Sequence, residues 1–163
     1  RIRNALGLES TFMKLQKASY CALYAVLELA NDPEVQLSAT DIAEKYNISA
    51  NHLAKVLRDL GRAGLVESVR GAGGGYRFCG NLKRTTLYDV IHLFEDVGGE
   101  NERLRDQQAD TDIGSALNLI LTEIDEIAIA TLGSITIGTL LKTMNWRLDR
   151  AKRENGKVEN KNF

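Results

Sequence analysis

The sequence predicts a mostly α-helical protein with a small β-hairpin, arranged as a winged helix-turn-helix domain followed by a long helix. Three observations predict this fold. Two capped helical segments, at residues 39–46 and 50–62, are separated by a very short turn, which is typical of a helix-turn-helix. Two short alternating segments flank the glycines of residues 71–75, as in a hairpin. Apolar residues recur at spacings of four and three between residues 113 and 127, as in a coiled coil.

Length and composition fit one domain of ordinary size, or a small domain with an oligomerisation element. The chain has 163 residues, 44% of them hydrophobic, and a single proline, which favours helices. No apolar run approaches the roughly 20 residues that cross a bilayer, so no membrane contact is expected. Two cysteines are too few for a disulfide framework, and a reducing cytoplasm is the expected compartment.

Charge is segregated along the chain, although its net value is only −1. Residues 13–84 hold ten Lys and Arg against seven Asp and Glu, and residues 85–131 hold two against eleven. Residues 132–163 are basic again, with seven against three. This distribution indicates a mildly basic first module beside an acidic one. Solvated helix faces would give the same charge pattern.

Four segments follow from these changes. Residues 1–12 are expected to be a flexible extension ahead of a natural start at Met13. Residues 13–84 form the winged helix-turn-helix domain, and residues 85–145 a linker helix, a polar loop and a dimerisation helix. Residues 146–163 are expected to be a basic, disordered tail, because Lys and Asn dominate them.

The first helices are marked by their ends. A largely buried helix at residues 18–31 ends before Pro33, which disfavours a helical residue preceding it. Ser38 and Asp41 resemble a capping box for the second helix. Asn47 suits a left-handed residue after that helix, and Ser49 caps the third.

Further elements follow in order. Residues 65–69 and 76–79 alternate as hairpin strands. Thr86 is expected to cap a fourth helix, and a polar loop occupies residues 97–111. The long helix is predicted at residues 112–132, stopped by Gly133, with a short last helix that ends at residue 145.

The third helix is the candidate DNA-reading element. Asn can pair bidentately with adenine, while Lys and Arg suit guanine edges or phosphates. Its outer face and cap supply the candidate contacts, which are Ser49, Asn51, His52, Lys55 and Arg58. An amphipathic helix solvated on this face is the alternative.

The hairpin tip is the second candidate element. Glycines let a backbone approach a sugar-phosphate wall closely, and an arginine can enter a narrow minor groove. The candidate residues are Arg70, Gly71, Gly73 and Tyr76, with Arg77, Lys83 and Arg84 as further phosphate contacts. A dinucleotide-binding loop is excluded, because the segment lies between strands and lacks the third glycine of that motif. A purely structural turn is the alternative.

The apolar seam of the long helix predicts a dimer, since one amphipathic helix extending past a small domain needs a partner. The seam could instead be intramolecular core. Its residues are Ile113, Leu117, Ile120, Ile124 and Ile127.

Other chemistry has little support. His52 and His92 have no companion at ligand spacing, so no metal site is expected. Cys21 and Cys79 are expected to act as small hydrophobic residues, with a redox role for Cys79 as the alternative. No nucleophile, base and acid occur in a catalytic pattern, so catalysis is not expected.

The segments around residues 13–15, 21–27, 42–44 and 53–66, with Val69 to Tyr76, resemble the Rrf2 family of bacterial winged-helix transcriptional regulators. The resemblance runs from about residue 13 to 145. It implies a homodimer on a palindromic operator, with the long helices crossing between subunits. It also implies that Asn51 and Lys55 are recognition-helix contacts and that Arg70 enters the minor groove.

The chain departs from this family in the sensing region. Iron–sulfur members carry three cysteines in the loop that corresponds to residues 97–111, and here that loop has none. No cofactor is therefore expected, since such clusters normally need thiolates. Ligation of a cluster by oxygen or nitrogen atoms of other helices is the alternative. Without a cluster, the resemblance implies that a small metabolite, a partner protein or a thiol modification is the signal.

The sequence thus predicts a homodimeric DNA-binding transcription factor, expected to be a repressor, with double-stranded DNA as its partner. The alternative is a winged-helix interaction module that binds a partner protein and not DNA. Steep salt dependence of binding to random DNA would separate the two.

Overall fold

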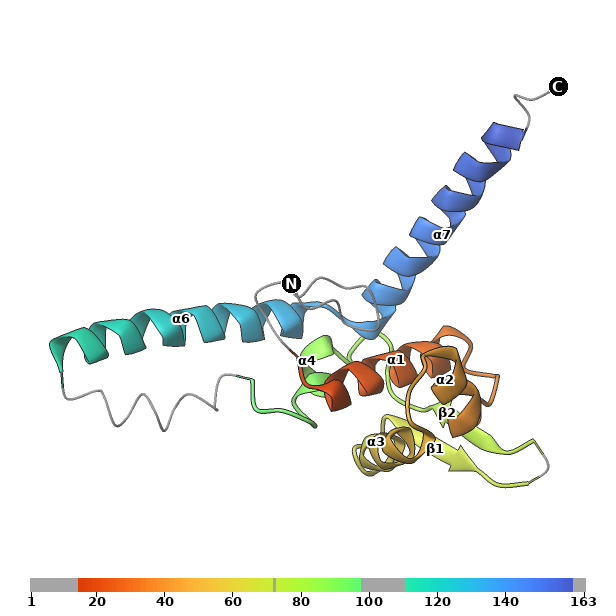
Figure 1. Cartoon of the computed structure of the whole chain (residues 1–163), viewed down its shortest axis with the longest axis horizontal. Helices are drawn as coiled ribbons and strands as arrows, with labels where there is room; N and C mark the ends of the chain where they lie inside the picture. The colour runs from red at the N-terminus through yellow and green to blue at the C-terminus, as the bar shows by residue number, and fades with distance from the viewer. Residues whose placement is uncertain (1–14, 72, 98–110, 160–163) are drawn as a thin grey trace.

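The computed structural model describes residues 15–71, 73–97 and 111–159, with side chains described to residue 150. The predicted extension at residues 1–12 and nearly all of the predicted loop at residues 97–111 lie outside them. The fold is mostly helical with one two-stranded hairpin, as predicted (Figure 1). In chain order its elements are α1 (Lys17–Asn31), α2 (Ala39–Lys45), α3 (Ala50–Arg62), β1 (Val66–Val69), β2 (Gly75–Phe78), α4 (Leu87–Ile91), α6 (Asp112–Ser134) and α7 (Ile137–Glu159).

The helix-turn-helix is formed by α2 and α3 through local hydrogen bonds. The Ser38 hydroxyl accepts the Asp41 N–H, and the Asp41 carboxylate accepts the Ser38 N–H, each at 3.0 Å. This reciprocal pair is the predicted capping box. Asn47 has a φ of 51°, so it reverses the chain in the left-handed region, also as predicted. These contacts set the direction in which α3 leaves the turn after α2.

A polar and aromatic cluster holds α2 against α1. The Tyr46 hydroxyl donates to the Glu28 carboxylate, and the Lys45 ammonium lies 2.7 Å from the same group. The rings of Tyr24 and Tyr46 stack with centroids 4.4 Å apart. Desolvation, and then the bond to Glu28, raise the pKa of Tyr46 well above its usual value. The cluster therefore sets the position of α2, and through the short turn that of α3.

The core of the domain lies under α1 and the inner face of α3. Burying a Leu or Val side chain contributes roughly 1.5–3 kcal/mol, so this contact is the main source of stability. The hairpin closes the core through Val66 and Phe78. The fully buried side chains from the two helices include Ala22, Val26, Leu29, Leu53, Leu57 and Leu60.

The hairpin is antiparallel and pairs Val66 with Phe78 and Val69 with Gly75. It is also joined to the loop between α1 and α2. Leu37 and Tyr76 exchange backbone hydrogen bonds of 3.1 and 2.8 Å, which form an isolated bridge. The wing is thereby attached to the segment that leads into the helix-turn-helix.

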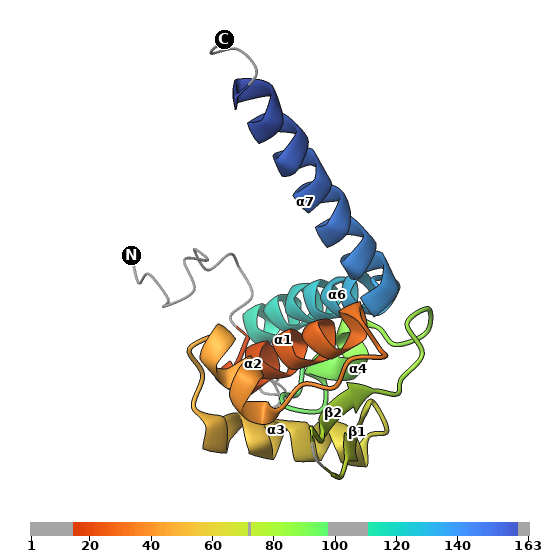
Figure 2. The ribbon, with the colours of Figure 1, turned by 90° about the vertical axis from the view of Figure 1, so that its right-hand side faces the viewer.

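Backbone bonds also tie the domain to the junction of α6 and α7. The Leu87 N–H donates to the Ile135 carbonyl, and the Ile137 N–H donates to the Thr85 carbonyl, both at 2.9 Å. The Gly138 N–H donates to the Leu82 carbonyl at the same distance. From this junction α6 and α7 leave in different directions, and α7 leaves away from α3 and the hairpin (Figures 1 and 2).

Two predicted ends were wrong. Gly133 does not stop α6, which runs to Ser134, because the glycine is tolerated inside a helix and the chain first becomes extended at Ile135. The last helix does not end at residue 145, and residues 146–159 of the predicted disordered tail belong to α7. Lys, Arg and Glu are good helix formers, and extending a helix that has already formed costs little free energy.

Candidate nucleic-acid interface

The outer face of α3 is exposed and basic. Asn51, Lys55 and Arg58 are exposed, whereas Leu53 and Leu57 on the other side are fully buried. Within the described residues, neither Lys55 nor Arg58 forms an ion pair with a carboxylate. Two uncompensated cations and a carboxamide therefore project from one side of the helix. This set of groups can bind phosphates and base edges.

Two other predicted contacts at the start of α3 also have structural roles. The Ser49 hydroxyl accepts the His52 N–H at 3.5 Å and so caps the helix. His52 is half-buried, and its Nε2 atom is sheltered from solvent without a hydrogen-bond partner among the described groups. In this conformation His52 therefore does not offer Nε2 to a ligand.

The wing presents Arg70 at the end of β1. Arg70 is exposed, and no described carboxylate pairs with it. Gly71 and Gly73 have φ values of 125° and 79°, which residues with a side chain adopt only with backbone strain. The turn that follows Arg70 thus needs these glycines. Tyr76 has a different role, because it is half-buried against the core and bonded to Leu37.

Of the further basic residues, Arg77 is already paired. Its Nε atom lies 2.6 Å from the Glu67 carboxylate, directly across the hairpin. Any phosphate contact by Arg77 would have to compete with this exposed ion pair. Lys83 and Arg84 are exposed and not paired with any described carboxylate. The cations available beside the wing are therefore Arg70, Lys83 and Arg84.

The seam of α6 is uncovered in the single chain. Ile113 is 83% exposed, and even the least exposed seam residue, Ile124, is 48% exposed. The seam is therefore not part of the core that the described residues form. The remaining seam residues, also exposed, are Leu117, Ile120 and Ile127.

Neither cysteine is activated. Cys21 is buried in α1, and burial raises the pKa of its thiol. Cys79 follows β2, and its thiol donates to the Gly64 carbonyl at 3.3 Å. Partial desolvation and then the charge of Glu67 raise the pKa of Cys79. Both thiols are therefore poorer nucleophiles at neutral pH than a cysteine of ordinary pKa.

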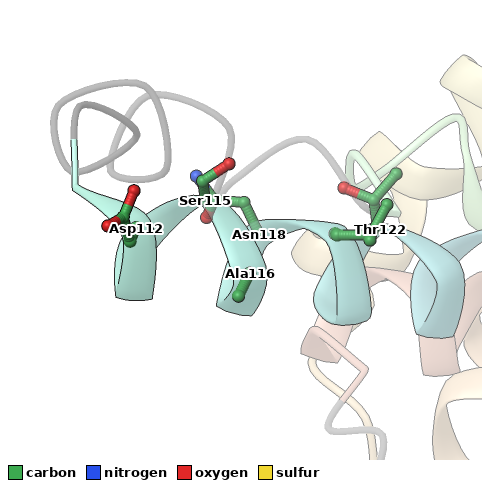
Figure 3. Close-up of a pocket in the computed structure, with 6 residues that line it drawn as sticks. Asp112, Ser115, Ala116, Asn118 and Thr122 are labelled. Atoms are coloured by element: carbon green, nitrogen blue, oxygen red, sulfur yellow. The ribbon is translucent and has the colours of Figure 1, made fainter.

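Two shallow pockets lie away from α3. One lies along α6, where its lining residues project from a single helix (Figure 3). The other lies between the end of α3, the hairpin and α4, and Arg84 and Asp89 supply its charges. Sequence patterns gave no sign of either. No described helix is both long enough and apolar enough to span a membrane.

A capped helix-turn-helix, a basic wing and a free helical seam define a winged-helix DNA-binding regulator of transcription. The chain belongs to the Rrf2 family: residues 15–143 match the model of that family, which is described as an iron-dependent transcriptional regulator. The family consists of regulators and not of enzymes.

Individual relatives agree. The chain is 56% identical over 144 residues to BadM of Rhodopseudomonas palustris, named as an HTH-type transcriptional regulator, covering 88% of this chain and 90% of BadM. It is 39% identical over 85 residues to NsrR of Bacillus subtilis, covering 52% and 58% of the two chains. CymR, the global cysteine regulator of B. subtilis, superposes with a TM-score of 0.67 at 26% identity over 81% of this chain and 98% of CymR. T. potens IscR superposes with a TM-score of 0.66 at 25% identity, over 82% of this chain and 89% of IscR.

The family description raises the question of whether this chain can hold iron. It has only two cysteines, one buried in α1 and one on the wing. Within the described residues, no group of three or more His, Cys, Asp or Glu side chains could hold a metal ion. A cluster held by three thiolates of one chain therefore does not fit this sequence.

Proposed function

We propose that this protein is a homodimeric repressor in the cytoplasm that binds a two-fold symmetric DNA operator. The observation that supports this proposal best is the bare seam of α6, which leaves the domain beside a helix-turn-helix with free cations. A dimer joined along α6 would carry two copies of α3 and two wings. Its operator would contain two related half-sites.

In this proposal α3 enters the major groove. Asn51 and Lys55 contact base edges, and Arg58 contacts the backbone. The Ser49 cap leaves the positive end of the α3 dipole near a phosphate, which adds to the attraction. The buried Leu53 and Leu57 fix the opposite side of the helix, so its reading face cannot rotate away.

The wing reaches the adjacent minor groove. Arg70 supplies the cation, and the glycines at residues 71 and 73 let the tip approach the backbone. The two bonds between Leu37 and Tyr76 hold the wing at a fixed angle to the helix-turn-helix. Groove insertion by Arg70 and by α3 would therefore be coupled.

We propose that the signal does not act through an iron–sulfur cluster. A small molecule or a regulatory protein could change the angle between the DNA-binding domains of the two copies. This change would alter the spacing of the two copies of α3 and so the affinity of the dimer for its operator. Iron and sulfide analysis of anaerobically purified protein tests this point. Stoichiometric iron and sulfide with a brown absorption band would contradict it.

Sedimentation equilibrium combined with DNA titration tests the main proposal. The wild type should sediment as a dimer and bind its own promoter region with nanomolar affinity at physiological salt. Ile120→Lys should give a folded monomer with much weaker binding, because a lysine would lie inside the seam. The matched control is Thr122→Lys, on the opposite side of α6. A monomeric wild type that ignores promoter DNA would contradict the proposal.

A further inference from the structure

The pocket between the end of α3, the hairpin and α4 has a volume of about 370 Å³. Small-molecule sites in proteins have volumes of roughly 300–1,000 Å³, so this pocket suits a small ligand. It is open to solvent, and a ligand can therefore enter without local unfolding. Its lining is half apolar and half polar, and consists of Ala63, Leu65, Leu93, Arg84, Thr85 and Asp89.

The buried Thr85 side chain indicates that the pocket can bind a polar group. Thr85 is only 7% exposed, yet its hydroxyl forms no hydrogen bond with any group in the part of the chain that the structure describes. Its backbone groups are both used: the N–H donates to the Asn81 carbonyl at 2.8 Å, and the carbonyl accepts the Ile137 N–H at 2.9 Å. Because buried hydroxyls normally have a partner, this one can donate to a ligand in the pocket.

Two opposite charges line the same pocket without pairing. Arg84 forms no ion pair with Asp89 or with any other described carboxylate. The Asp89 Oδ2 atom accepts the N–H and the hydroxyl of Thr86, both at 2.8 Å, whereas its Oδ1 atom accepts no hydrogen bond from the described residues. The pocket therefore offers a guanidinium and a hydroxyl to an anion, and a carboxylate oxygen to a cation.

This combination selects a zwitterion. A ligand with only a carboxylate would bring a like charge beside Asp89, and a ligand with only an ammonium group would do the same beside Arg84. A ligand with both groups complements both residues. The half-buried Leu65 and the 41% exposed Leu93 supply apolar surface, which an apolar ligand group would cover.

We propose that this pocket binds an α-amino acid with an apolar side chain. The ligand carboxylate binds to the Arg84 guanidinium and the Thr85 hydroxyl. Its ammonium group donates to the Oδ1 atom of Asp89. Its side chain packs against Leu65 and Leu93.

The place of the pocket connects the ligand to DNA binding. On one side, the Leu65 N–H donates to the Leu60 carbonyl of α3 at 3.0 Å, and on the other, Thr85 holds the start of α7 through Ile137. Arg84 is also a predicted phosphate contact, and a bound carboxylate would compete for it. The amino acid should therefore weaken operator binding. This regulatory role names the small-molecule signal of the proposed function and rests on it, whereas the binding site does not.

Calorimetry on the full-length protein tests the site, with L-leucine, L-methionine and L-phenylalanine as probes. At least one should bind with a dissociation constant below about 1 mM. The analogues of that probe that lack its ammonium group or its carboxylate should each bind about tenfold more weakly or worse, because each loses a charged hydrogen bond.

Two pairs of variants locate the ligand. Arg84→Gln should weaken amino-acid binding about tenfold or more. Its matched control is Lys83→Gln, which removes a neighbouring exposed cation outside the pocket and should change the affinity less than about twofold, because solvent and salt screen that charge. Leu93→Gln should also weaken binding, whereas Leu148→Gln, at an exposed leucine of α7, should not.

An operator titration then tests the regulatory role. A saturating amino acid should weaken operator binding by the wild type about fivefold or more, and have no effect on Leu93→Gln. Unchanged or tighter operator binding by the loaded wild type would overturn the regulatory role alone.

The site itself has separate tests. No binding of any probe at about 10 mM would overturn it. So would equal affinity of the wild type, Arg84→Gln and Leu93→Gln. A wild type that binds an amino acid but no promoter DNA would contradict the proposed function and leave the site standing.

Discussion

Leu37 and Tyr76 exchange two backbone hydrogen bonds and thereby join the loop before α2 to the second strand of the wing. This pair connects the two elements that are proposed to contact DNA, although the residues lie far apart in the sequence. The space between the two backbones is small. A Cβ atom at Gly75 would lie 2.6 Å from the Leu37 carbonyl oxygen. Only glycine therefore fits beside the bridge.

We predict that Gly75→Ala lowers the free energy of unfolding by about 1–3 kcal/mol, because two backbone segments must move apart. Operator affinity should fall as well, since the wing loses its fixed angle. Urea unfolding and fluorescence anisotropy measure the two effects. Gly133→Ala is the control: a Cβ there meets nothing within 4 Å, and alanine favours the helix. Equal stability of the two variants would contradict the prediction.

We predict that Arg70→Ala weakens operator binding by about 1–3 kcal/mol and leaves stability unchanged, because Arg70 is exposed and unpaired with any described carboxylate. The effect should be largest on operators with A·T-rich sequence under the wing, where the minor groove is narrow. Arg62→Ala, which removes an exposed cation paired with Asp59, is the control. An affinity equal to that of the wild type in the same titration would rule out the role of the wing.

We predict that Tyr46→Phe destabilises the domain by about 1–2 kcal/mol, because the Glu28 carboxylate loses a hydroxyl donor. The raised pKa of Tyr46 gives this effect a pH dependence. The stabilisation is fully present below the unfolded-state pKa, near 10, and is lost as pH rises above it. Stability should therefore fall more steeply between pH 10 and 11 in the wild type than in the variant. Parallel pH profiles would contradict this assignment.

We predict that Cys79 reacts with a maleimide more slowly than the cysteine of an unstructured peptide at pH 8, because its pKa is raised. Cys21 should react only on unfolding, since its side chain is buried. Peptide mapping after timed alkylation distinguishes the two sites. A Cys79 that outpaces the peptide, together with peroxide-sensitive DNA binding lost in Cys79→Ser, would instead support a thiol switch.

The local parts of the fold were predictable because their signals are local. The side chains of the capping residues Ser38, Ser49 and Thr86 each accept a hydrogen bond from the backbone N–H three residues later. Asn47 reverses the chain through its own left-handed backbone conformation. Contacts between distant residues left no such pattern. Glu95, for example, accepts hydrogen bonds from the Gln16 N–H and the Ser19 hydroxyl at the start of α1, and no spacing indicates this.

The candidate site shows the same division. Helical spacing identified the exposed face of α3 and the seam of α6, since burial repeats with the helix. It did not show that Arg77 pairs with Glu67, that Nε2 of His52 is sheltered, or that Tyr76 is bonded to Leu37. The length of α7 was missed because a charged, Asn-containing segment resembles a disordered tail in composition.

Footprinting of the wild-type protein on its own promoter tests the central claim most directly, with hydroxyl radicals as the probe of the minor groove and dimethyl sulfate, which methylates guanine N7, as the probe of the major groove. We predict two protected regions related by two-fold symmetry, with major-groove centres one or more helical turns apart and protected minor grooves beside them. Arg70→Ala should lose the minor-groove protection and keep the major-groove protection. A single protected region, or none at salt concentrations where phosphate contacts are strong, would contradict a symmetric dimer that reads DNA through α3 and the wing.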